Sequence, residues 1–229
     1  MHILAFLFFA INVVYATPVM HTNFAYRFLD QYFTEYTPKE SKEFILGVLY
    51  PDIQYLQVIE RETTHEFNIH LEDILAAETP FKAGIKLHCF IDELRERYIQ
   101  ETAIYTHLDR FPQQNIHLLL KLIEDEILYS DAHIDRAKQC LNEVIEEEFM
   151  QGLTSHTLRT WHRVLSQYLS NPPCTILRRL RQFGLGLFGV DPEEIALWSR
   201  SLSQIVTIED IKAYIQGFEA LFDQEIAKK

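Results

Sequence analysis

FILGVLYPD at residues 44–52 and AGIKLHCFID at residues 83–92 each contain one glycine, and no other glycine occurs before residue 150. A glycine inside a helix destabilises it by about 1 kcal/mol relative to alanine, so it usually marks a place where a neighbouring helix or a ligand approaches the backbone closely. Gly47 is followed by Pro51 and Asp52, and Gly84 lies one helical turn before His88. We therefore expect both glycines to lie beside a functional side chain.

Hydrophobic residues recur at spacings of three and four through most of the chain, as at Phe24, Phe28 and Tyr32, and alternation with period two is nearly absent. This pattern predicts an all-α, multi-helix bundle. Thr37-Pro38, Thr79-Pro80 and Asp191-Pro192 have the residues of helix starts. The expected helices span residues 21–36, 39–48, 66–77, 80–104, 114–128, 131–149, 155–170, 173–183, 191–203 and 207–227.

His88 and Asp92 are four residues apart, which places an imidazole and a carboxylate on one helix face. The imidazole offers one lone pair, and the carboxylate can bridge two cations. His21, Asp52 and His65 precede this pair, so five candidate metal ligands fall within 72 residues. The alternative is a plain helical bundle in which His88 and Asp92 are only hydrogen-bonded to each other.

The order of these residues resembles the zinc-dependent phospholipase C family, whose all-helical fold is shared with fungal single-strand nucleases and with the catalytic domain of glycosylphosphatidylinositol-specific phospholipase D. The resemblance covers about residues 21–92. It implies that Asp52, His65, His88 and Asp92 hold one zinc ion, and that His21 and a bridging Asp92 hold a second. Such ions bind phosphate oxygens and activate water for attack on phosphorus. We assign the catalytic role among these ligands to Asp52.

The sequence departs from the family at the third zinc, which a later histidine and a His-x-x-x-Glu pair hold. Here Phe111 follows His107 by four residues and Lys121 follows His117 by four. We therefore expect a two-zinc, metal-dependent phosphoesterase-like hydrolase that acts on a phospholipid or a small phosphodiester. The alternative is a noncatalytic exported helical protein that retains a partial metal site. Secreted family members also use their N-terminal amine as a ligand, and cleavage after Ala16 would create such an amine four residues before His21.

The first sixteen residues, MHILAFLFFAINVVYA, contain no charged side chain and have a hydrophobic run followed by Val14-Tyr15-Ala16. This order is typical of a signal peptide, although a buried first helix or an uncleaved anchor also fits. We expect cleavage after Ala16 and export to the periplasm or the medium. The remaining residues 17–229 would form a single all-helical domain, with the metal site in residues 21–92 and accessory helices in residues 113–229.

The charge balance of 33 acidic against 21 basic residues gives a net charge of −12, which disfavours binding to long nucleic acids. Three basic residues, Arg178, Arg179 and Arg181, precede GLGLFG at residues 184–189. This glycine pattern matches a dinucleotide-binding motif but follows no strand, so we set that interpretation aside. Together with Leu185, Leu187 and Phe188, the arginines are expected either to form a surface for transient membrane contact or to pack within the bundle.

Two further features concern single residue types. The acidic run Glu143, Glu146, Glu147 and Glu148 has no histidine beside it in the sequence, so we expect a solvated helix face. The three cysteines, Cys89, Cys140 and Cys174, allow at most one disulfide and do not form a disulfide framework.

Overall fold

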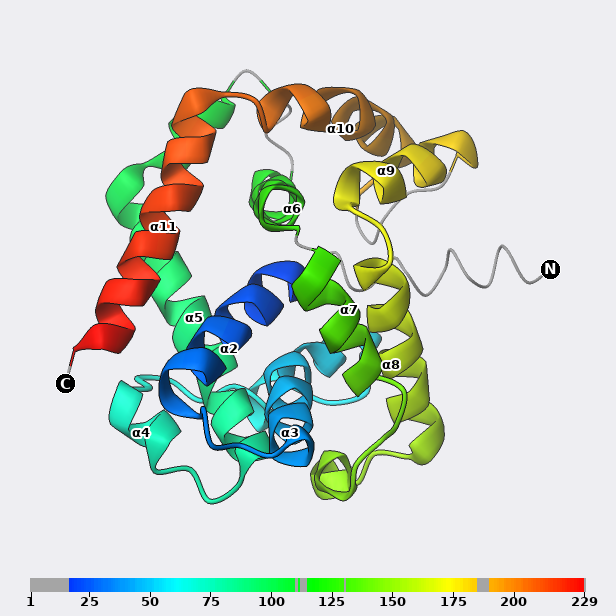
Figure 1. Ribbon diagram of the computed structural model, residues 1–229. Coiled ribbons are helices and arrows are strands. Elements are labelled where there is room, and N and C mark those ends of the chain that lie inside the picture. The colour runs from blue at the N-terminus through cyan, green and yellow to red at the C-terminus, as the bar shows by residue number, and fades with distance from the viewer. Residues whose placement is uncertain (1–16, 110, 112–114, 130, 185–189, 229) are drawn as a thin grey trace.

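The computed structural model describes residues 17–109, 111, 115–129, 131–184 and 190–228, and these residues form an all-α fold without strands (Figure 1). The predicted fold class is therefore confirmed. The α-helices are α2 (Pro18–Tyr32), α3 (Pro38–Leu49), α4 (Leu71–Leu75), α5 (Pro80–Thr102), α6 (Ile116–Leu128), α7 (Asp131–Cys140), α8 (Ser155–Leu169), α9 (Pro173–Gln182), α10 (Pro192–Ile205) and α11 (Glu209–Ala227). Short 3₁₀ helices lie between them: η2 (Pro51–Leu56), η3 (Arg61–Thr63), η4 (Ile104–Leu108) and η5 (Glu146–Gln151).

The predicted helix starts are confirmed at three prolines. The Thr37 side chain accepts a hydrogen bond from the amide of Glu40, and the Glu40 carboxylate accepts one from the amide of Thr37, which completes a capping box. Thr79 and Asp191 cap α5 and α10 in the same way through the amide three residues later. These caps fix where α3, α5 and α10 begin.

Two predicted helices are shorter than expected. The helix expected at 131–149 ends at Cys140, and its second half forms η5 instead. The helix expected at 66–77 is confined to α4 (Leu71–Leu75). In both cases a group of the segment has a tertiary partner that a continuous helix would not provide: the Glu148 side chain turns inward to a histidine of α8, and the backbone amide of Asn68 donates to the carboxylate of Glu93 of α5.

Among the described helices, α3 and α5 share the most extensive contact, and they meet at the two glycines. A Cβ atom on Gly84 would clash with the carbonyl oxygen of Phe44 and lie 2.7 Å from the amide nitrogen of Val48. A Cβ atom on Gly47 would clash with the carbonyl oxygen of Phe81. The atoms in the way belong to backbone and cannot swing aside. The glycines thus let the two helices approach more closely than any side chain would permit.

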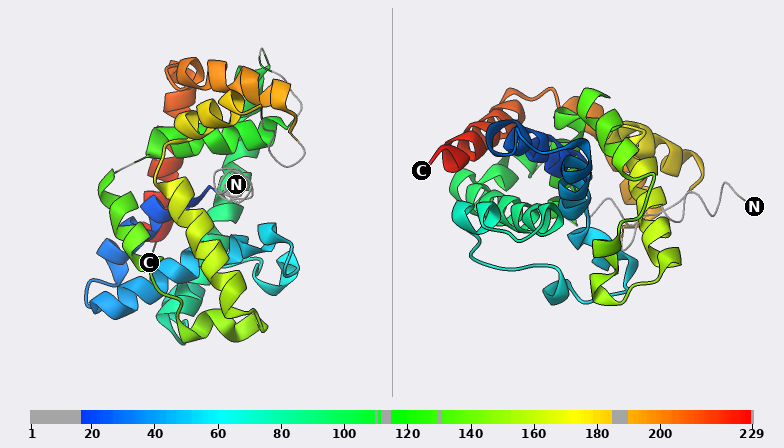
Figure 2. Two further views of the ribbon diagram at one scale, coloured as in Figure 1. Left: turned by 90° about the vertical axis from the view of Figure 1, so that its right-hand side faces the viewer. Right: turned by 60° about the horizontal axis from the view of Figure 1, so that its bottom comes forward.

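Other helices surround part of this pair, and α9 and α10 form a separate layer against α6 (Figures 1 and 2). Helix α2 lies against α3, α5 and α6, α11 packs along α5, and α9 packs on α10 (Figures 1 and 2). A buried polar network ties three of these helices together: Arg95 of α5 donates from Nε to both oxygens of Glu124 of α6, at 3.0 and 2.8 Å, and Tyr214 of α11 donates to the same carboxylate at 2.9 Å. Since these groups are buried, the network holds α5 firmly against α6.

Within the part of the chain that the structure describes, no helix is long and apolar enough to cross a membrane. The expected signal peptide, residues 1–16, lies outside the described residues, as do Leu185, Leu187 and Phe188 of the expected lipid-contacting surface. The thiols of Cys89, Cys140 and Cys174 are free.

We predict that Gly84→Ala lowers the free energy of unfolding by about 1–3 kcal/mol, because overpacking against immovable backbone outweighs the gain in helix propensity. Gly217→Ala is the matched control: this glycine also lies in a helix, but its Cβ would meet only the hydroxyl end of the partly exposed Tyr98 side chain. Urea denaturation followed by circular dichroism measures both variants. A Gly84→Ala protein as stable as the wild type would show that the helices do not depend on this contact.

Candidate metal centre

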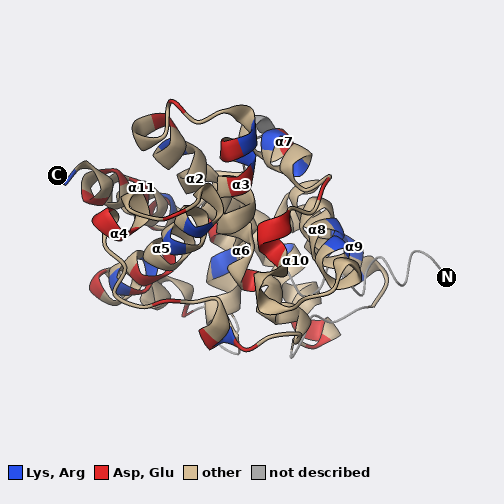
Figure 3. Cartoon of the chain, turned by 90° about the horizontal axis from the view of Figure 1, so that it is seen from below, with Lys and Arg blue, Asp and Glu red and all other residues tan. Residues whose placement is uncertain are grey.

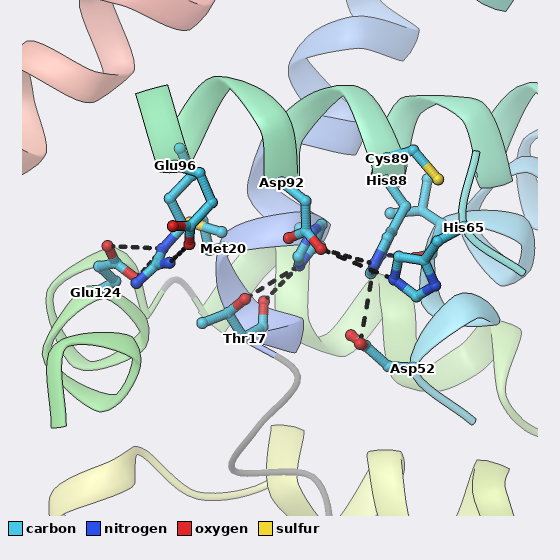
Figure 4. Close-up of polar contacts among 12 residues, drawn as sticks. Thr17, Met20, Asp52, His65, His88, Cys89, Asp92, Glu96 and Glu124 are labelled. Atoms are coloured by element: carbon cyan, nitrogen blue, oxygen red, sulfur yellow. Dashed lines mark hydrogen bonds and ion pairs between the residues drawn. The ribbon is translucent and has the colours of Figure 1, made fainter. Parts of the chain in front are cut away.

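The five predicted ligands converge in one place, as Figure 4 shows for Asp52, His65, His88 and Asp92. Helix α2 contributes His21, and α5 contributes His88 and Asp92. Asp52 lies in η2, directly after α3, because Pro51 ends that helix, and His65 follows η3. The four residues other than Asp92 are at most 5% exposed, whereas the Asp92 side chain is 22% exposed. Asp92 is therefore the side of the cluster that faces solvent.

Most of the distances between the potential ligand atoms are longer than hydrogen bonds. Asp92 Oδ2 lies 3.6 Å from His88 Nε2 and 3.8 Å from His65 Nε2, and Asp92 Oδ1 lies 3.3 Å from His21 Nε2. Asp52 Oδ1 lies 3.9 Å from His88 Nε2. Ligands about 2.1 Å from a tetrahedral zinc ion are separated from one another by about 3.4 Å. The observed spacing suits a cation between the side chains better than direct contact between them.

The other ring nitrogen of His21 and of His88 faces a backbone carbonyl. His21 Nδ1 lies 3.0 Å from the carbonyl oxygen of Thr17, and His88 Nδ1 lies 2.9 Å from that of Val48. A carbonyl oxygen only accepts hydrogen bonds, so each Nδ1 carries a proton and donates. In the neutral ring Nε2 then has the free lone pair, which is the arrangement found in metal-binding histidines.

His65 has the same tautomer, with the proton on Nδ1, but its Nδ1 donates to a hydroxyl group rather than to a carbonyl. Its Nδ1 lies 3.1 Å from Thr64 Oγ1, and that hydroxyl lies 3.1 Å from the carbonyl oxygen of Pro51, to which it donates. Because the hydroxyl proton goes to the carbonyl, Thr64 accepts from His65 Nδ1. The lone pair of His65 therefore also resides on Nε2.

All three Nε2 atoms are buried and have no hydrogen-bond partner among the described residues. Leaving one such group unsatisfied destabilises a protein by about 1–3 kcal/mol, so three in one cluster call for a ligand. The potential ligand atoms form two overlapping groups, His21, His88 and Asp92, and Asp52, His65 and His88, with all atoms of a group within 4.8 Å of one another. These buried His/Asp clusters can hold a metal ion.

The pKa values of His21, His65 and Asp92 in the cluster are shifted by burial and by the charges of neighbouring groups. Burial opposes charging of His21, but the neighbouring carboxylates of Asp92 and Asp52 outweigh it and raise the pKa of the imidazole. Burial also opposes ionisation of Asp92, yet His88 and His21 hold the pKa of that carboxyl well below its usual range. Burial, together with the neighbouring His88 and Arg61, lowers the pKa of His65 to about 3, so its ring is neutral. A bound cation would supply the charge that these carboxylates attract.

A basic side chain, that of Arg61, reaches the exposed side of the cluster. Arg61, at the start of η3, places its guanidinium 3.5 Å from Asp92 Oδ2, and its side chain is 43% exposed. Tyr55 of η2 interacts with this guanidinium, and burial beside Asp52 and Asp92 raises the pKa of the tyrosine. Arg61 was not among the residues singled out from the sequence, because nothing in its spacing links it to Asp92.

One expectation outside the cluster needs correction. Glu148 is not on a solvated face: its carboxylate is buried and lies 2.6 Å from Nε2 of His162 of α8. His107 lacks the acidic residue four positions later, as the sequence indicated, and forms an ion pair with Asp210 of α11 at 3.2 Å. The His107 pair is at the exposed surface and adds no ligand to either group of potential metal ligands.

Comparison with known proteins gives no relative: no family model matches the chain, and neither a curated protein nor a solved structure shows significant similarity to it.

Proposed function

We propose that this chain is a metal-dependent phosphoesterase-like hydrolase that acts on a phospholipid or a small phosphodiester through two zinc ions. The observation that carries the proposal is the convergence of three unpartnered imidazole Nε2 atoms on two carboxylates. Nitrogen and carboxylate oxygen ligands in a tetrahedral arrangement are typical of zinc.

The first ion would be held by Asp52, His65 and His88, with Asp92 as the fourth ligand. His88 belongs to both candidate groups but has a single lone pair, so it serves only this ion. The second ion would be held by His21 and the other oxygen of Asp92, which lie 3.3 Å apart. Two protein ligands leave positions for water and substrate, as a catalytic zinc requires.

The chemistry follows from this assignment. Two ions bridged by Asp92 would bind phosphate oxygens and lower the pKa of a bound water. We assign to Asp52 the role of orienting that water, because one carboxylate carries two oxygens and only one is needed as a ligand. Arg61 lies on the exposed side of Asp92, where its guanidinium can meet a phosphate that enters from solvent.

The location of the protein determines which substrates it can meet. We infer that the chain is exported after cleavage behind Ala16, on the strength of its uncharged, hydrophobic first sixteen residues. A phospholipid and a small soluble phosphodiester would both be available there. The alternative is a noncatalytic exported helical protein that retains a partial metal site, and the two experiments below separate these functions.

We predict that the protein purified without chelator binds two zinc ions per chain and that Asp92→Asn binds at most one, because the bridging carboxylate is lost. Removing zinc should lower the melting temperature of the wild type by roughly 5–10 °C, since metal that binds only the folded state stabilises it. Elemental analysis and calorimetry give the two readouts. His107→Ala is the matched control and should keep both ions, because His107 lies outside the cluster. A wild-type protein without zinc and indifferent to chelator would overturn the metal site.

We predict zinc-dependent hydrolysis of bis(p-nitrophenyl) phosphate or of a short-chain phosphatidylcholine by the zinc-loaded wild type. Asp92→Asn should reduce the rate at least a hundredfold, and His107→Ala should leave it unchanged. Arg61→Gln should retain zinc and lose at least tenfold in kcat/KM, because it removes a phosphate contact and no metal ligand. Full zinc occupancy with no hydrolysis of either substrate would favour the noncatalytic alternative.

A further inference from the structure

A long segment of this acidic protein contains no acidic residue. Residues 149–190 include no Asp or Glu, although about six would be expected in 42 residues at the average frequency of the chain. The same segment carries five arginines and no lysine, so the remainder of the chain has a net charge of −17. The described part of this segment contains the end of η5, α8, α9 and the connections between these helices. Charge in this protein is therefore strongly separated.

The five arginines are on the surface and lack acidic partners. Each is exposed, and none forms an ion pair with a described acidic residue: Arg159 and Arg163 on α8, and Arg178, Arg179 and Arg181 on α9. By contrast, eleven of the described basic residues elsewhere form such pairs, as Lys42 does with Glu143 and Arg97 with Glu225. We call these five residues the arginine face.

The two helices lie along one side of the molecule, with α9 above α8 in Figure 1 and both toward the viewer in the left panel of Figure 2. Figure 3 marks the basic positions of α8 in blue. The apolar residues of α9, Ile176, Leu177 and Leu180, are buried in the core, so the helix can present only its charged side to a partner. At the end of α9, Phe183 is 53% exposed and extends the arginine face with an aromatic ring.

The part of the arginine face on α8 is hollowed. Arg159 and Arg163 are one helical turn apart and line a surface pocket of about 740 Å³. Ser155, Ser166 and Asn142 add hydroxyl and amide groups to its wall, and its one carboxylate, Glu143, is paired with Lys42. Two guanidinium groups with neighbouring hydroxyl donors provide the chemistry that binds a phosphate group.

We propose that the arginine face docks the protein onto an anionic phospholipid membrane, with the pocket of Arg159 and Arg163 taking a lipid headgroup phosphate. Arginines near an anionic bilayer are attracted to it over about the Debye length, and Phe183 beside them can enter the interfacial region. The orientation follows from the charge separation, because the acidic remainder of the protein then points away from the membrane. The inference does not depend on the metal centre.

A nucleic acid is the competing polyanion and fits less well. A membrane surface meets one side of the protein alone, whereas a long nucleic acid that extends past the arginine face would meet a remainder with a net charge of −17. The sequence pI of about 5.3 also lies far below that of typical nucleic-acid-binding domains.

The test is flotation of the full chain with vesicles of phosphatidylcholine alone and with 30% phosphatidylserine at about 0.1 M salt. We expect binding only to the anionic vesicles, weakening as salt is raised. Replacing all five arginines of the arginine face by Gln should weaken binding to the anionic vesicles at least a hundredfold. The matched control removes five cations from elsewhere, with Lys39, Lys82, Arg97, Lys212 and Lys228 replaced by Gln, and should bind within about threefold of the wild type.

Circular dichroism and the melting temperature check that both variants fold. Inorganic phosphate, added as a competitor, distinguishes a pocket that binds free phosphate from a surface that binds a membrane. Millimolar phosphate should not displace the protein from vesicles if several arginines act together. Equal binding of the wild type to neutral and anionic vesicles would overturn the proposal. So would an equal loss of vesicle binding in the five-arginine variant and in the control variant, or binding of the wild type to single-stranded DNA but not to vesicles.

Discussion

The backbone contact between α3 and α5 at Gly47 and Gly84 is the constraint on which the rest of the structure depends. Because no Cβ separates the helices there, the carbonyl of Val48 comes within 2.9 Å of His88 Nδ1 and fixes the proton of that ring. The chain leaves α3 at Pro51 immediately afterwards, so Asp52 enters the cluster beside His88. One helix crossing thus sets the positions of two potential metal ligands, Asp52 and His88, and the tautomer of His88.

The remaining ligands depend on contacts that reinforce this crossing. Asp125 of α6 is buried and accepts hydrogen bonds from the amide of Met20 and from the hydroxyl of Tyr168, both at 2.9 Å, which anchors the first turn of α2 where His21 lies. His21 in turn stacks on His88 with ring centroids 4.1 Å apart. Asp125, which lies outside the cluster, thus helps to fix the position of His21, as expected for a preorganised site.

Sequence reasoning reached the parts of this structure that local spacing determines. The period of hydrophobic residues predicted the helices, and the rarity of glycine before residue 150 pointed to the place where helices meet. The i, i+4 spacing placed His88 and Asp92 on one face. What it missed depends on tertiary contact: the pair of Glu148 with His162 joins residues from different elements, and the tautomer of each histidine depends on a carbonyl or hydroxyl that only the fold supplies.

Anomalous diffraction at the zinc absorption edge, from crystals grown with zinc, would locate any zinc ions in the cluster. We expect two peaks about 3.5–4 Å apart, one within bonding distance of Asp52, His65 and His88 and the other of His21, with Asp92 between them. An absence of peaks at this cluster, with zinc bound only at surface residues, would contradict the proposed two-zinc site.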